Sequence, residues 1–95
     1  MAISEDFLTI GFEIRDGALY YHGVIYDKYN LFLIVENKKN KTRENFQITF
    51  SDMQREPLGK FSGAIKLKKG KSIVKILIKD LENKLVYAEE KEFIV

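Results

Sequence analysis

Apolar and polar residues alternate with a period of two along most of this chain. Phe46, Ile48 and Phe50 alternate with polar residues, and the same spacing recurs around residues 61–67 and 74–78. This pattern is typical of a β-strand with one buried face. No apolar stripe with the spacing of a helix face extends over three turns. The sequence therefore predicts an all-β protein.

Turn-forming residues divide the chain into strands of ordinary length. Seven strands are predicted, at Phe7–Arg15, Ala18–Tyr26, Leu31–Asn37, Asn45–Asp52, Lys60–Lys68, Lys71–Lys79 and Leu85–Val95. The polar residues 38–44 are expected to form a loop, and residues 54–59 a second one. Strands with one apolar face need a second layer to bury it. We therefore predict one domain over residues 1–95, a seven-stranded antiparallel β-sandwich, with a small barrel as the alternative.

The first predicted hairpin has its turn at Asp16-Gly17. A two-residue turn of this kind pairs residues 7–15 with residues 18–26 over their whole length and places Ile14 opposite Leu19. Most of the large apolar residues then fall on one face. A slip of one residue would mix the two faces, so this register is well specified.

A second hairpin is predicted around Lys69-Gly70. It pairs residues 60–68 with residues 71–79 and places Ile65 opposite Val74. One face of this hairpin is mainly apolar. The other face carries lysines, to which Ile73 and Leu77 add apolar surface.

Residues 31–35 are apolar on both faces of their predicted strand. Such a strand is either central in a sheet whose outer side is also covered, or part of an interface on an otherwise solvated sheet. Phe32 and Ile34 are therefore interface candidates.

Three segments resemble parts of immunoglobulin-like and fibronectin-III-like sandwich modules. Leu31–Asn37 (LFLIVEN, followed by KKNK) is similar to their central strand. Ile65–Val74 (IKLKKGKSIV) resembles a strand, glycine turn and strand of small accessory modules, and Asp80–Val86 (DLENKLV) resembles their last hairpin. The chain lacks the cysteine pair and tryptophan of antibody-type domains. The resemblance implies an immunoglobulin-like sandwich and brings no catalytic residues with it.

The inventory of catalytic side chains is small, with one histidine, His22, and no cysteine. The absence of cysteine excludes disulfides, thiolate metal sites and thiol nucleophiles. His22 has no second base or nucleophile in a recognisable pattern, and Asp80 and Glu82 are too few for a calcium site. We predict no catalytic residue, no metal site and no cofactor, and a cytoplasmic location if the chain is complete.

Basic residues concentrate in the middle of the chain, where residues 38–79 contain twelve basic and three acidic residues. This clustering suggests a surface for a polyanion such as nucleic acid, an acidic partner or an anionic membrane surface. A solvated face whose lysines protect a sheet edge is the simpler interpretation. The polyanion candidates are Lys38, Lys39, Lys41, Arg43, Lys66, Lys68 and Lys75.

Tyrosines gather in the first third of the chain. In the hairpin register set by Asp16-Gly17, Tyr20, His22, Val24 and Tyr26 share the face opposite the core. An exposed aromatic strip suits protein docking or the stacking of sugars. Cross-strand aromatic packing within the sheet is the structural alternative.

Taken together, these patterns favour a non-enzymatic protein-interaction or assembly module. It would dock a protein partner or a second copy of itself, as a homodimer, through a sheet face or edge. A module that binds a carbohydrate or a polyanion such as nucleic acid is the alternative. No apolar run approaches the length that a membrane span requires.

Overall fold

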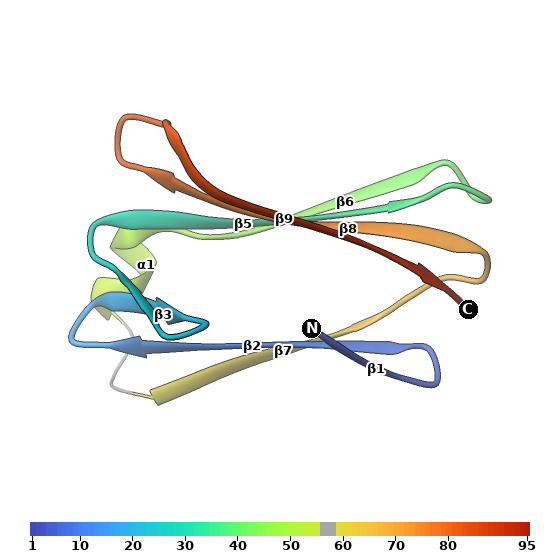
Figure 1. Ribbon diagram of the computed structural model, residues 1–95, viewed down its shortest axis with the longest axis horizontal. Helices are drawn as coiled ribbons and strands as arrows, with labels where there is room; N and C mark the ends of the chain where they lie inside the picture. Colours follow the sequence, from blue (N-terminus) through green and yellow to red (C-terminus); the bar gives the residue numbers. More distant parts are fainter. Residues whose placement is uncertain (56–58) are drawn as a thin grey trace.

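The chain folds into two antiparallel β-sheets that stack face to face (Figure 1). The computed structural model describes residues 1–55 and 59–95, and the side chains of these residues except residues 2 and 59–64. The predicted all-β sandwich is confirmed. The described residues form nine strands rather than seven, together with one short helix.

Sheet A contains five strands, and sheet B contains four. Sheet A consists of β1 (Ala2–Ser4), β2 (Phe7–Arg15), β3 (Ala18–Tyr21), β4 (Val24–Tyr26) and β7 (Gly59–Lys66). One edge of β2 pairs with β1 and then β3, and the other edge pairs with β7. Sheet B has the order β6-β5-β8-β9, with β5 (Tyr29–Asn37), β6 (Thr42–Ile48), β8 (Lys71–Asp80) and β9 (Leu85–Ile94).

The hydrophobic core lies between the two sheets. Strands β2, β5 and β8 direct alternate side chains into this space, as the period of two predicts. The buried members are Leu8, Ile10, Ile14, Leu19, Tyr21, Leu31, Val35, Met53, Leu67, Val74, Ile76 and Ile78. Because the core takes one face of each sheet, the other face of sheet B is free for the surface described below.

The predicted hairpin at Asp16-Gly17 is confirmed near its turn and wrong beyond it. Ile14 lies opposite Leu19 as expected, but the pairing of β2 with β3 extends no further than Glu13 and Tyr20. The chain reverses again at His22-Gly23, where both residues have positive φ angles, of 49° and 76°. A two-residue turn with positive φ at both positions closes a tight hairpin. Residues 24–26 therefore pair with β3 rather than with β2.

The predicted hairpin at Lys69-Gly70 is wrong, because its two strands belong to different sheets. Ile65 in β7 pairs with Leu8 of β2, and Val74 in β8 pairs with Val35 of β5. Two strands with one apolar face each can bury those faces side by side or against each other across a core. Their alternation does not distinguish the two arrangements. The segment between them is a crossover.

The predicted strand Asn45–Asp52 is also wrong in its second half. Strand β6 begins at Thr42, within the expected loop 38–44, and a helix, α1 (Phe50–Arg55), follows it. Thr49 and Asp52 form a capping box, in which the Thr49 N–H donates to the Asp52 carboxylate and the Asp52 N–H donates to the Thr49 hydroxyl. This reciprocal cap favours a helix start over continued strand. The expected loop 54–59 lies partly outside the described residues.

Candidate functional site

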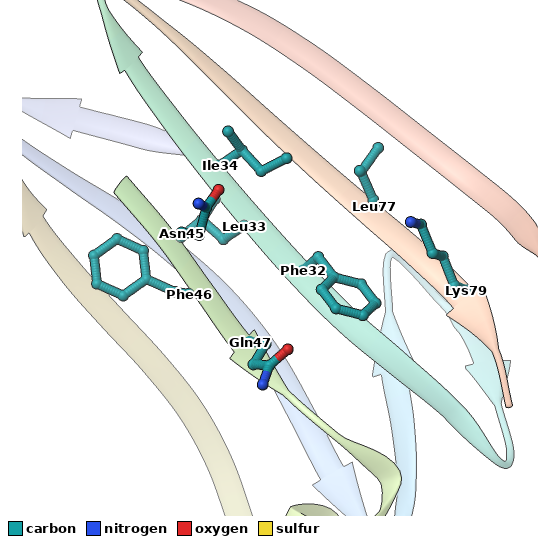
Figure 2. A pocket seen from close by; sticks show the side chains of 8 residues that line it. All are labelled: Phe32, Leu33, Ile34, Asn45, Phe46, Gln47, Leu77 and Lys79. Carbon is teal, nitrogen blue, oxygen red and sulfur yellow. The ribbon is translucent and has the colours of Figure 1, made fainter. Parts of the chain in front are cut away.

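The outer face of sheet B carries an apolar groove. The side chains of β5 that point away from the core include Phe32 and Ile34, and Leu77 of β8 lies opposite Phe32. These three side chains line a groove with a volume of about 410 Å³, together with Asn45, Gln47 and Lys79 (Figure 2). The structure thus brings together Phe32 and Ile34, two of the six interface candidates that the sequence suggested. The sequence predicts Leu77 only as apolar surface on a lysine-rich face and does not indicate the groove.

The charges at the middle of this face are compensated within the chain. Lys75 Nζ lies 3.3 Å from Glu36 Oε1 and 3.8 Å from Glu90 Oε1. The hydrogen bond and charge of Lys75 lower the pKa of Glu36, so this carboxylate stays ionised in mildly acidic solution. Lys79 Nζ lies 5.2 Å from the centre of the Phe32 ring, within cation–π range. The apolar groove therefore lies beside the paired charges of Lys75, Glu36 and Glu90 and is lined by the Lys79 side chain over the Phe32 ring.

The predicted strip of Tyr20, His22, Val24 and Tyr26 does not form. The turn at His22-Gly23 places Tyr26 opposite Leu19, on the core side of the hairpin, while Tyr20 faces outward beside Glu13. His22 lies in the turn itself. Val24, the first residue after the turn, is about half exposed. The sugar-stacking interpretation required these four side chains to share one face, and the structure does not place them on one face.

Instead, the tyrosines form an aromatic cluster between the sheets. The Tyr26 ring lies 5.8 Å from that of Tyr29 and 6.4 Å from that of Tyr87. Tyr21 is buried, its ring lies 5.9 Å from that of Tyr87, and its hydroxyl donates to Glu89 at 2.7 Å. Burial, and then the contact with Glu89, raise the pKa of Tyr21. These are structural contacts that attach the β3–β4 hairpin to β9.

The remaining polar candidates have structural roles. His22 packs edge-on against Tyr21, with 4.2 Å between ring centres. Asp80 accepts hydrogen bonds from the N–H groups of Glu82 and Lys84, so its carboxylate caps the β8–β9 turn. Among the described residues, no group of three histidine or acidic side chains is arranged to hold a metal ion.

A second surface of interest is held together by Asn37, which is only 4% exposed. Its amide nitrogen lies within hydrogen-bond distance of the Lys68 carbonyl and the Ser72 hydroxyl, at 3.1 Å each, and of the Lys69 carbonyl at 3.3 Å. Its side-chain oxygen accepts from the backbone N–H of Asn40 at 2.8 Å. One buried amide thus ties the β5–β6 loop to the crossover between the sheets.

This tie brings most of the predicted polyanion residues to one end of the sandwich, which we call the basic end. It consists of Lys38, Lys39, Lys41, Arg43, Lys68 and Lys69, on the β5–β6 hairpin and the crossover beside it (Figure 1). Within the described part of the chain only Lys38 of these has an acidic group within 4.0 Å, Glu36 at 3.8 Å. Lys66 pairs with Asp6, and Lys75 lies apart on the outer face. Asn37 and Lys69 were not among the predicted site residues.

Comparisons with protein-family models, with curated proteins and with solved structures found no match. The class of the protein therefore rests on its fold, a small two-layer β-sandwich without cysteine. No helix within residues 1–55 and 59–95 has the length and apolar character needed to cross a membrane.

Proposed function

We propose that this chain is a non-enzymatic protein-interaction module whose docking surface is the outer face of sheet B. The observation that carries the proposal is the groove between Phe32, Ile34 and Leu77, on a sheet whose other face already forms the core. Contiguous apolar surface that the fold does not use for its own core is typical of interaction sites. A groove of this shape suits one or two apolar side chains of a partner, framed by the amides of Asn45 and Gln47.

A displayed library of random peptides, selected on the purified chain, tests this surface directly. We expect enriched peptides to carry a large apolar residue and to bind Leu77→Lys about tenfold more weakly than the native chain. Ile25→Lys is the matched control, because Ile25 is also exposed, in the β3–β4 hairpin, and does not line the groove. Peptides that bind the native chain and Leu77→Lys equally well would refute the proposal.

The basic end supports a second candidate function, the binding of an anionic polymer. Lys39, Lys41, Arg43, Lys68 and Lys69 have no ion-pair partner within 4.0 Å among the described residues. The Asn37 hydrogen bonds hold their two segments side by side before any ligand binds. Such preorganised charge favours a polyanion, with an affinity that falls steeply with salt.

A DNA duplex is a suitable probe for this second candidate. We expect fluorescence anisotropy to show salt-dependent binding whose log–log slope decreases by about one for Lys39→Ser and again for Lys68→Ser. Lys84→Ser, in the β8–β9 turn, is the control and should leave the slope unchanged. Equal slopes for all variants would refute a role of the basic end.

We further propose that the sandwich is immunoglobulin-like in topology. Immunoglobulin domains place strands A, B and E in one sheet and C, F and G in the other, to which some add C′. The neighbours β1-β2-β7 correspond to A-B-E, and β6-β5-β8-β9 corresponds to C′-C-F-G. The β3–β4 hairpin is then an insertion after strand B, and α1 replaces strand D. An experimental structure with β7 paired to sheet B would contradict this relationship.

A further inference from the structure

The cross-strand registers define how the outer face of sheet B is ordered. Three rows run across the sheet from β6 to β9. They are Gln47–Phe32–Leu77–Ala88, Asn45–Ile34–Lys75–Glu90 and Arg43–Glu36–Ile73–Glu92. The β6 side of these rows therefore ends in Arg43 and two amides, whereas the β9 side ends in two carboxylates and an alanine. Between the two sides lie four apolar side chains and the ion pair of Lys75 with Glu36.

We infer that two copies of this chain dock through these faces, about a two-fold axis parallel to the strands and between β5 and β8. Such an axis keeps each row opposite itself and reverses its direction. Phe32 of one copy then meets Leu77 of the other, which joins the two grooves. The inference rests on the proposed function and names a second copy as the partner.

Charge complementarity supports this partner and this orientation. The axis places Arg43 of each copy opposite Glu92 of the other, and the Asn45 amide opposite the Glu90 carboxylate. Arg43 has no ion-pair partner within 4.0 Å among the described residues, and Glu92 is exposed, with only Lys71 at 3.3 Å. A two-fold axis perpendicular to the strands would instead place Phe32 opposite Glu36. The parallel axis is therefore the favoured one.

The charged centre of the face is compatible with such docking. Lys75 faces Ile34 of the second copy and is accompanied by Glu36 and Glu90 of its own chain. A buried charge that keeps counter-ions from its own chain avoids much of the desolvation cost that an unpaired charge would have. Two sheets that pack in this way keep their strands within about 30° of each other.

The area of the outer face of sheet B indicates what affinity to expect for the dimer. The face is four strands wide, at about 4.8 Å per strand, and about seven residues long, at about 3.3 Å per residue. Its area is therefore roughly 440 Å² per copy. Twice this area lies below the range of stable interfaces and within that of weak, transient ones. We therefore expect a dimer that dissociates with a constant of the order of 10⁻⁴ M.

Sedimentation equilibrium of the full chain across this concentration range is the test. We expect Arg43→Glu and Glu92→Arg each to weaken the dimer about tenfold, because each places like charges opposite one another. The double variant restores the pair with its signs exchanged. An equimolar mixture of the two single variants restores it as a heterodimer. Lys84→Glu, in the β8–β9 turn, is the matched control and should dimerise like the native chain.

Two outcomes would overturn the inference. A native chain that stays monomeric up to about 1 mM, ten times the expected dissociation constant, excludes the dimer. A dimer that neither the double variant nor the mixture restores excludes this axis. If library peptides still bind the groove in either case, the docking surface stands and its partner is not a second copy. If peptides and dimer both fail, the proposed function falls as well.

Discussion

Replacing Asn37 with alanine removes the hydrogen bonds that join the β5–β6 loop to the crossover. An amide group has two hydrogens, so at most two of the acceptors on Lys68, Lys69 and Ser72 are fully served at once. The side-chain oxygen accepts at least one further bond, from the Asn40 backbone. Each of the three bonds contributes about 1 kcal/mol, and the variant leaves the Ser72 hydroxyl, on a residue that is 0% exposed, without the Asn37 amide. We therefore expect the free energy of unfolding to fall by about 2–4 kcal/mol.

Urea unfolding, analysed by linear extrapolation, measures this loss. Asn40→Ala is the matched control, because it removes only bonds at the rim of the network and should cost about 1 kcal/mol. Hydrogen exchange of the Lys38 amide, which donates to the Lys71 carbonyl at 2.8 Å, should accelerate in Asn37→Ala alone. The reasoning is refuted if the two variants differ by less than about 0.5 kcal/mol.

Three further predictions concern stability. Tyr21→Phe should cost about 1–2 kcal/mol through the lost bond to Glu89. Because the folded pKa of Tyr21 is raised, the stability of the native chain should fall as the pH rises above 10.0. Tyr21→Phe should lose less stability over the same range, which urea titrations at alkaline pH measure. The folded pKa values of Glu36 and Asp52 are lowered, so stability should fall as the pH drops below about 4.5, and Asp52→Asn should flatten this loss in acid titrations. Gly17→Ala should cost about 1–2 kcal/mol, because φ is +77° and a Cβ would contact Gln54. Gly11→Ala, with nothing within 4 Å of the added Cβ, should be close to neutral, and urea unfolding of both glycine variants measures the difference.

Local pattern was sufficient for the fold class and for much of the strand layout. Alternation identified the buried face of β2, including Leu8, Ile10 and Ile14, because side chains on a strand alternate regardless of its neighbours. It also identified residues 31–35 as apolar on both faces of their strand, and that strand, β5, lies between β6 and β8. Phe32 and Ile34 followed from that observation and lie in the groove.

Local pattern failed where a short signal competed with a longer one. The His22-Gly23 turn gives a weaker signal than the alternation, which continues on either side of it. A positive φ such as that of His22 is uncommon outside glycine, and histidine adopts it more readily than most other residues. The capping box at Thr49 and Asp52 was visible in the sequence and was overridden by the apolar spacing of Phe46, Ile48 and Phe50.

The sequence by itself determined which residues share a face within an uninterrupted strand such as β2 or β5, because that depends only on the two-residue period of a strand. It also held a signal for Asn37, a polar residue in register with the buried Leu31 and Val35. Only the tertiary structure decided which strands are neighbours and which face each other across the core. Those choices depend on contacts between residues far apart in the chain, such as Ile65 with Leu8 and Val74 with Val35. The groove and the basic end both arise from such contacts, because each combines side chains from separate strands or loops.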